Sequence, residues 1–213
     1  MIFNKDSAQQ VAESLLQIKA IKLNPANPFT WASGWNSPIY CDNRKSLSYP
    51  PVRTYIRQQF VAAINEHFPN AEAIIGVATG GIALGALVAE EMGLPFAYVR
   101  SASKGHGMQN LIEGDVQENQ KVVVIEDLIS TGGSSLKAVD ALRDFGCDVL
   151  GMSAIFTYGF DVAKENFENK KCALVTLSDY DNLLEIATKK EYINKDDLNS
   201  LSNWRTSPST WNK

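Results

Sequence analysis

Acidic, hydroxyl and glycine residues follow one another in the segment KVVVIEDLISTGGSSL, residues 121–136. Four apolar residues, typical of a buried strand, precede Glu126 and Asp127, and both carboxylates can turn toward a ligand where a strand ends. Residues 130–134 add hydroxyls and unobstructed backbone N–H groups, which form a phosphate cradle when a helix begins beside them. A sugar phosphate fits both halves, because its hydroxyls can donate to the carboxylates while its phosphate occupies the loop.

Other interpretations of this segment explain less of it. A strand, a glycine turn and a helix cap account for T-G-G-S, but not for two acids placed before two hydroxyl residues. The segment lacks G-x-x-x-x-G-K-[ST], and no G-x-G-x-x-G follows any apolar run. Nucleoside triphosphatases and NAD enzymes are therefore disfavoured.

A second segment, S-A-S-K-G-H-G at residues 101–107, places cationic groups between small residues. Lys104 and His106 follow Arg100 closely, so this loop can close over an anion and exclude water. A solvated basic surface loop is the alternative interpretation. The other histidine, His67, is expected to be structural, because it ends an amphipathic helical pattern.

The elements that must position these residues follow an alternating pattern from residue 73 onward. Continuous apolar strands separated by helices are typical of a parallel sheet covered on both faces, which is an α/β fold. Ligands of such sheets lie beyond the carboxyl ends of the strands. The predicted strands are 73–78, 94–100, 121–127, 149–158 and 172–179, and the predicted helices are 82–92, 134–145 and 162–167.

The two ends of the chain show other patterns. A helix is expected over residues 6–20, capped by Asp6 or Ser7, and another over residues 51–67. Between them, residues 24–51 hold five of the eight prolines, and ordered loops of such length usually serve a function. The last residues, 200–213, are expected to have little structure.

Length and charge restrict the class of protein. A chain of 213 residues with normal globular composition is expected to form a single domain, residues 1–213. Its net charge of −4 provides no field to attract nucleic acid or an anionic membrane. The three cysteines form no C-x-x-C pair, and no secretory signal or bilayer-spanning segment is apparent, so a cytoplasmic protein is expected.

Taken together, these segments resemble a known family. V-V-V-I-E-D-L-I-S-T-G-G-S is similar to the phosphoribosyl-diphosphate (PRPP) motif of type I phosphoribosyltransferases. FTWASGWNSPIYCDNR (29–44) and YVRSASKGHGMQNLIEGD (98–115) resemble the hood over the pyrimidine and the catalytic loop of the orotate phosphoribosyltransferases. With VATGGIALG (77–85), the resemblance covers about residues 6–160.

The resemblance implies a Rossmann-like type I phosphoribosyltransferase fold, a central parallel sheet flanked by helices with an N-terminal hood. The hood would cover about residues 1–50, the core about 51–180 and a C-terminal helical extension about 181–213. The implied reaction, in pyrimidine biosynthesis, converts orotate and PRPP into orotidine 5′-monophosphate and diphosphate, with Mg²⁺ held by PRPP and by no protein side chain directly. The implied assembly is a homodimer whose catalytic loops reach into the neighbouring subunit's site, with no nucleic-acid or membrane partner.

The resemblance also assigns roles to residues. Lys104, His106 and Asp127 would be catalytic, with Asp127 stabilising positive charge on the ribose ring. Ser130 would lie near the orotate. Beyond the resemblance, Arg44 is a candidate contact for orotate, and Tyr40 is a candidate to cover the pyrimidine, with packing of the hood as its equal alternative. PRPP would be bound by Arg100, Lys104, His106, Glu126, Asp127, Leu128, Ile129, Ser130, Thr131, Gly132, Gly133 and Ser134.

Some positions depart from the family pattern. Gly80, Ser101 and Ala32 stand where some members carry a lysine, so three cations are absent. The family's arginine contact for the orotate carboxylate has no counterpart near residues 158–160; Arg44 is a candidate replacement, and a structural ion pair is an equal alternative. The same PRPP site would also serve uracil or a purine base, or a PRPP-sensing regulator.

Overall fold

A six-stranded sheet forms the centre of the computed structural model, which describes residues 1–31, 34–101 and 111–211. The strand order is β10-β9-β8-β5-β6-β7, and all neighbours are parallel except β7, which runs antiparallel to β6. The expected parallel sheet is confirmed, with β7 as an unpredicted antiparallel edge. The strands are β5 (Ala73–Val77), β6 (Phe96–Val99), β7 (Ile112–Glu113), β8 (Lys121–Ile129), β9 (Asp148–Thr157) and β10 (Leu174–Asp179).

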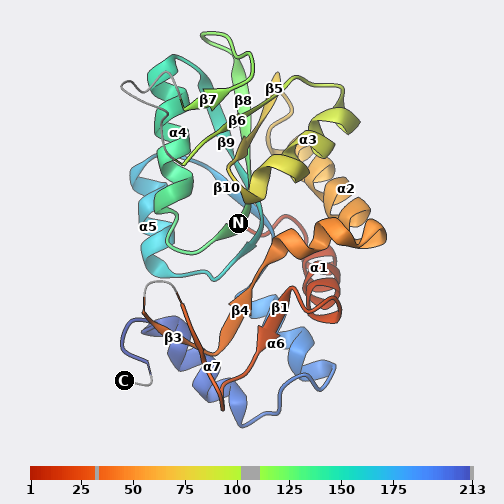
Figure 1. Ribbon diagram of the computed structural model, residues 1–213, viewed down its shortest axis with the longest axis vertical. Helices are drawn as coiled ribbons and strands as arrows, with labels where there is room; N and C mark the ends of the chain where they lie inside the picture. Colours follow the sequence, from red (N-terminus) through yellow and green to blue (C-terminus); the bar gives the residue numbers. More distant parts are fainter. Residues whose placement is uncertain (32–33, 102–110, 212–213) are drawn as a thin grey trace.

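Helices cover both faces of this sheet. In Figure 1, α4 (Gly133–Phe145) and α5 (Asp161–Asn169) lie on one side, and α2 (Pro50–His67) and α3 (Gly80–Met92) lie on the other. The central strand β8 therefore buries five consecutive residues, 122–126, since neither of its faces meets solvent. This covering explains why the strand sequences are continuously apolar.

The first helix, α1 (Lys5–Gln17), begins one residue earlier than expected and ends three residues earlier. Its cap is Asn4, whose side chain accepts from the backbone N–H groups of Asp6 and Ser7 at 2.9 and 3.1 Å. The prediction that Asp6 or Ser7 caps the helix was therefore wrong. Just before α1 the chain pairs with the free edge of β10, where the Phe3 N–H donates to the Thr176 carbonyl at 3.0 Å.

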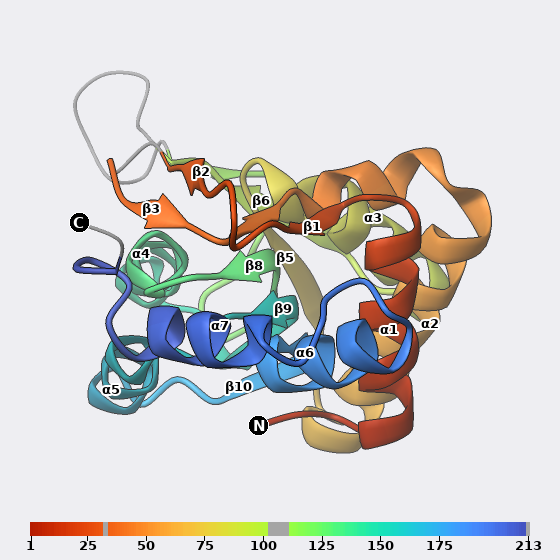
Figure 2. The same ribbon diagram turned by 90° about the horizontal axis from the view of Figure 1, so that it is seen from below.

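The proline-rich segment between α1 and α2 forms short strands and a 3₁₀ helix. β1 (Ile21–Leu23) pairs with β4 (Ile39–Cys41), and β2 (Phe29–Thr30) pairs with β3 (Asn36–Ser37), both antiparallel. The 3₁₀ helix η1 (Asn43–Ser48) then leads into α2. Figure 1 shows β3 at the same end of the molecule as the last helix, α7 (Asp197–Thr206), and Figure 2 shows β2 and β3 next to each other. These four strands are called the hood below.

The C-terminal residues are more structured than expected. Helix α6 (Tyr180–Lys189) is followed by α7 (Asp197–Thr206), and the side chain of Trp204 is fully buried. The Trp204 ring lies 5.4 Å from the rings of Phe160 and Tyr180 and 5.5 Å from those of Trp31 and Tyr158, centroid to centroid. The prediction of little structure was wrong for residues 200–206. Leu198, Leu201 and Trp204 recur at three-residue spacing, and Leu201 and Trp204 are both fully buried, as on the packed face of a helix.

Within the described ranges, no helix combines the length and apolar character that crossing a bilayer requires.

Truncating Trp204 tests whether α7 is part of the core. Trp204→Ala should lower the free energy of unfolding by about 3–5 kcal/mol, the usual cost of removing a buried tryptophan, and Trp204→Phe should lower it less. Chemical denaturation measures both. Tyr192→Ala, at an exposed aromatic, is the control, and a Trp204→Ala protein as stable as this control would show that α7 adds little to the core.

Candidate active site

Two carboxyl groups stand side by side on the central strand. Glu126 is only 6% exposed; it accepts from the Ser135 hydroxyl at 2.8 Å and from the Asp127 N–H at 3.0 Å. Burial, followed by the charge of Asp127, raises the pKa of Glu126 to about 8. The pair does not lie at the strand end as expected, because β8 stays paired with β9 as far as Ile129. The surroundings of Glu126 therefore favour its protonated form.

Three separate segments meet at Asp127. The carboxyl group of Asp127 lies against Gly80 of α3, so closely that a Cβ atom on Gly80 would overlap it. Behind it, the fully buried Asn43 of η1 donates from Nδ2 to the Asp127 carbonyl at 2.7 Å. A side chain at position 80 would displace the Asp127 carboxylate. The close approach of Asp127 therefore requires glycine at this position and leaves no room for a lysine.

The segment from Ser130 to Gly133 connects β8 to α4. Gly132 has a φ of +79°, and a Cβ atom on it would lie 2.7 Å from the Phe167 ring of α5. Asn166 of α5 donates to the Thr131 carbonyl at 2.9 Å. The N–H groups of the first turn of α4 have no carbonyl of the helix to bind, and no side chain among the described residues caps them. The loop therefore presents free donors and the positive end of a helix dipole to an anion, as expected.

Three adjoining cavities open along this edge of the sheet. The middle one, of 370 Å³, is lined by Glu126, Asp127, Gly80 and Arg44. It shares Cys41 and Leu128 with a cavity of 320 Å³ under the hood, and Ala78 and Ser134 with a cavity of 460 Å³ beside Arg100. A ligand with three parts can therefore extend across the row.

The hood cavity is lined largely by aromatic rings. Trp31, Tyr40 and Tyr158 line it, together with the hydroxyl residue Ser130. The rings of Trp31 and Tyr158 lie 5.3 Å apart, and burial raises the pKa of Tyr158 well above its usual range, so its hydroxyl stays neutral. Apolar rings with few polar groups suit a flat heterocycle. The structure thus brings Tyr40 and Ser130 together, as predicted from the sequence.

The predicted cationic residues differ in where they lie relative to the cavities. Arg100 lines the 460 Å³ cavity and lies 3.4 Å from a carboxylate oxygen of Glu113. Arg44 lines the middle cavity rather than the hood cavity, and its Nε lies 2.7 Å from Asp42. Its contact with orotate stays a prediction. Lys104 and His106 lie outside the described residues.

Sequence reasoning missed four residues that shape the site. Ser135 and Asn43 hold the acid pair, Cys41 lies between two of the cavities, and Lys137 lines the cavity of Arg100. Lys137 follows the loop by one helical turn, so its position could have been inferred. The contact of Asn43 joins residues 84 positions apart and leaves no local signal.

Metal binding depends on the same carboxylates. Within the described ranges, no group of three or more His, Cys, Asp or Glu side chains could hold a metal ion. Mg²⁺ usually takes one or two carboxylates together with water and substrate phosphates. Asp127, which forms no ion pair among the described residues, fits such a shared site. The donor set is therefore compatible with Mg²⁺ bound mainly to a diphosphate.

Comparison with known proteins agrees with this geometry. A family model described as "Phosphoribosyl transferase domain" matches residues 52–186, more than half of the chain. The matched region contains the whole parallel part of the sheet, the acid pair and the phosphate loop. Fold and site together define a phosphoribosyltransferase.

Similar proteins show to which family of phosphoribosyltransferases the chain belongs. An orotate phosphoribosyltransferase from Porphyromonas gingivalis is 58% identical over 97% of this chain and 99% of its own length. One from Phocaeicola vulgatus is 60% identical over 94% of both chains. The crystal structure of the enzyme from Aeropyrum pernix is 28% identical, covers 86% of this chain and 99% of its own, and superposes with a TM-score of 0.75. The chain belongs to the orotate phosphoribosyltransferase family.

The raised pKa of Glu126 makes stability depend on pH. The native state holds this proton up to about pH 8, whereas a glutamate in the unfolded chain releases it near pH 4.5. Stability should therefore fall as pH rises through this window, and Glu126→Gln, which mimics the protonated form, should remove that part of the fall.

Denaturant unfolding of the ligand-free protein at pH 5 and pH 8 measures the effect. The free energy of unfolding of Glu126→Gln, relative to that of wild type, should be larger at pH 8 than at pH 5. Glu165→Gln, at an exposed residue of α5, is the matched control. An unchanged difference between Glu126→Gln and wild type would contradict the burial argument.

Proposed function

We propose that the protein transfers the 5-phosphoribosyl group of PRPP to N1 of orotate, giving orotidine 5′-monophosphate and diphosphate for pyrimidine nucleotide synthesis. The observation that carries this proposal is that the cavity of the acid pair adjoins the aromatic cavity on one side and the cavity of Arg100 on the other, with Ser134 of the phosphate loop at its edge, so that a ribose there would have space for a base and for a phosphate group beside it. Membership of the orotate phosphoribosyltransferase family supports the choice of base.

PRPP would be held by its phosphate and its ribose. The 5-phosphate would accept from the N–H and hydroxyl groups of residues 130–134, with Leu128 and Ile129 in contact beside them. Glu126 and Asp127 would bind the 2′ and 3′ hydroxyls. A protonated Glu126 can both donate to and accept from a hydroxyl, whereas the carboxylate of Asp127 only accepts. The pair would thus match two hydroxyls with little repulsion between its members.

Reaction would begin with cleavage of the bond between the anomeric carbon and the diphosphate oxygen, which keeps the electron pair. Positive charge then develops on the ribose ring, and the Asp127 carboxylate, held against Gly80, stabilises it. N1 of orotate then adds to the anomeric carbon from the opposite face and gives up its proton, which the departing diphosphate or water would take. Trp31, Tyr40 and Tyr158 would cover the pyrimidine and exclude water that would otherwise hydrolyse the activated sugar.

The departing diphosphate needs compensating charge. Mg²⁺ bound to it supplies Lewis-acid neutralisation of this charge. Arg100, Lys104 and His106 would contact it, and Lys104 or His106 would neutralise or protonate it. Lys137 lines the cavity of Arg100 and forms no ion pair within the described ranges, so it would add a cation where Gly80 and Ser101 add none.

We also propose a cytoplasmic homodimer whose 101–107 loops act in the neighbouring site. Three free cysteines are consistent with a reducing compartment. The resemblance of this loop to the family's catalytic loop supports its action in the site of the neighbouring subunit.

Base selectivity tests the proposal most simply. Purified protein with PRPP and Mg²⁺ is incubated in turn with orotate, uracil, hypoxanthine and adenine, and nucleotide formation is followed by absorbance and chromatography. Orotate should be converted at least about 100-fold more efficiently than the others, since discrimination by polar groups is strong. Preference for another base would show that this base, and not orotate, is the substrate. No turnover of any base, with PRPP bound, would favour a PRPP-sensing regulator.

The loop lysine provides a second test. Lys104→Ala should lower kcat by roughly 100-fold or more, the scale of a positioned charge or proton donor. Lys189→Ala, on the exposed end of α6, is the control. A loss under about tenfold would remove Lys104 from the catalytic group.

Mixing two inactive proteins tests the shared site. Lys104→Ala and Asp127→Asn dimers should each lack activity, but a hybrid dimer contains one site with both intact residues. Activity should therefore return on subunit exchange. No recovery, with hybrid dimers demonstrated by mass spectrometry, would argue against a loop supplied by the neighbouring subunit.

A further inference from the structure

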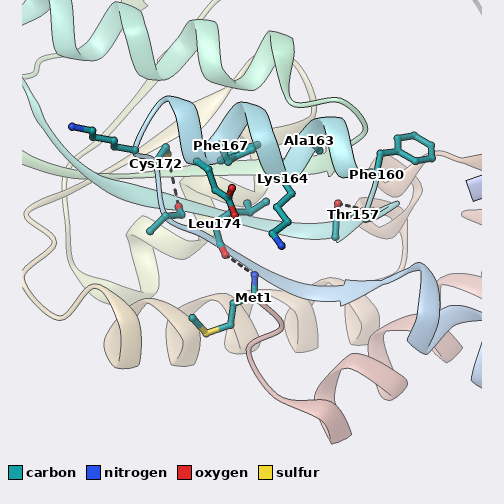
Figure 3. A pocket seen from close by; sticks show the side chains of 12 residues that line it. Met1, Thr157, Phe160, Ala163, Lys164, Phe167, Cys172 and Leu174 are labelled. Atoms are coloured by element: carbon teal, nitrogen blue, oxygen red, sulfur yellow. Dashed lines mark hydrogen bonds between the residues drawn. The ribbon is translucent and has the colours of Figure 1, made fainter. Parts of the chain in front are cut away.

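A fourth cavity lies away from the row described above. It has a volume of 520 Å³ and opens between α5 and the chain just before β10, with Met1 at its edge (Figure 3). It shares no lining residue with the three substrate cavities. Its volume is in the range of small-molecule sites.

The floor of this cavity is apolar. Phe160, Ala163, Phe167 and Cys172 line it, and each is at most 5% exposed. Burial raises the pKa of Cys172 to about 11, so its thiol is neutral and adds to the apolar surface. The Thr157 hydroxyl already accepts from the Gly159 N–H at 3.1 Å. The floor therefore offers contact area and few free polar groups.

The rim carries an excess of positive charge. Lys164 and Lys171 are exposed, and neither forms an ion pair within the described ranges, whereas the neighbouring Lys170 is paired with Asp140 at 2.8 Å. Glu168 is the single acidic residue in the lining. Figure 3 shows the Lys164 side chain extending along the cavity beside Thr157 and Leu174. An apolar floor below two unpaired lysines complements a molecule with an apolar body and one anionic group.

We propose that this cavity is a second binding site, for a small organic carboxylate with an apolar body. The body would pack on Phe160 and Phe167, and the carboxylate would lie toward Lys164 and Lys171. A polypeptide partner or a second copy of the chain would bury about 800 Å² on each side, and the oligomeric state measured below distinguishes a second copy from a small ligand.

A ligand in this cavity would affect the phosphate loop. Phe167, which lines the cavity, packs directly under Gly132, and its neighbour Asn166 holds the Thr131 carbonyl. A ligand against Phe167 restricts the movement of α5 and with it the loop. This second part rests on the proposed role of the loop in binding the PRPP phosphate, whereas the binding site itself does not.

Calorimetric titration of the full chain with decanoate, below its micelle concentration, tests the site without any assay of activity. Saturable binding of one decanoate per chain is expected, with decanol about two- to fivefold weaker, the scale of exposed charge pairs. Lys164→Gln with Lys171→Gln should weaken decanoate by about the same factor. Ala163→Phe, which fills the cavity, should abolish binding.

The matched control replaces Lys189 and Lys195, two exposed lysines elsewhere, with glutamine. No saturable binding, an equal loss in this control, or undiminished binding by Ala163→Phe would overturn the proposal. So would a change of oligomeric state in Ala163→Phe on sedimentation, because the cavity would then be an interface between copies. Circular dichroism of each variant shows that it is folded.

A second measurement tests the coupling. Saturating decanoate should change the KM for PRPP at least about twofold, with the KM for orotate unchanged, and should have no effect on Ala163→Phe. Binding without any change in the KM for PRPP would overturn the coupling. A protein that binds decanoate but turns over no base would contradict the proposed function and leave the site standing.

Discussion

The structure depends on two neighbouring carboxyl groups held together inside a parallel sheet. Burying a charged carboxylate is costly, and two of them side by side repel each other, so one keeps its proton. The surroundings of the pair stabilise this arrangement. Ser135 donates to Glu126, Asn43 donates to the carbonyl of Asp127, and Gly80 leaves space for the Asp127 carboxylate. Each of these contacts comes from a different element, so α4, η1 and α3 are all held against one strand.

A cluster of aromatic rings connects the hood to the C-terminal helices. Tyr158 belongs both to this cluster and to the lining of the hood cavity, and Trp204 packs against it from behind. The cavity proposed for the base is therefore backed by the last helix of the chain. Each ring of this cluster is contacted on several sides, so the aromatic side chains that line the cavity are held in fixed positions.

Much of the core was predictable because its signals are local. Continuous apolar runs indicated the parallel strands, and the glycines and hydroxyls of residues 130–134 indicated the start of α4. The acid pair and the two residues of the hood cavity, Tyr40 and Ser130, were named from the sequence as well. The structure also showed one departure, since Glu126 is buried within the strand rather than exposed at its end.

The remaining features depend on contacts that local patterns do not show. Asn43 and Asp127 are far apart in the sequence, and Trp204 is buried only because four other rings surround it. The hood strands have two or three residues each, too few for an alternating pattern to be recognised. Tertiary packing decides such short elements rather than propensity.

Titration of PRPP into wild type and Asp127→Asn, followed by calorimetry at pH 7 with Mg²⁺, tests the central claim that the acid pair binds the ribose. Asparagine keeps the shape of the side chain and removes its charge. The account predicts that wild type binds PRPP and that the variant, with an unchanged circular dichroism spectrum, binds about tenfold or more weakly, the usual loss for a charged hydrogen bond. Equal affinity of the two proteins for PRPP would contradict it.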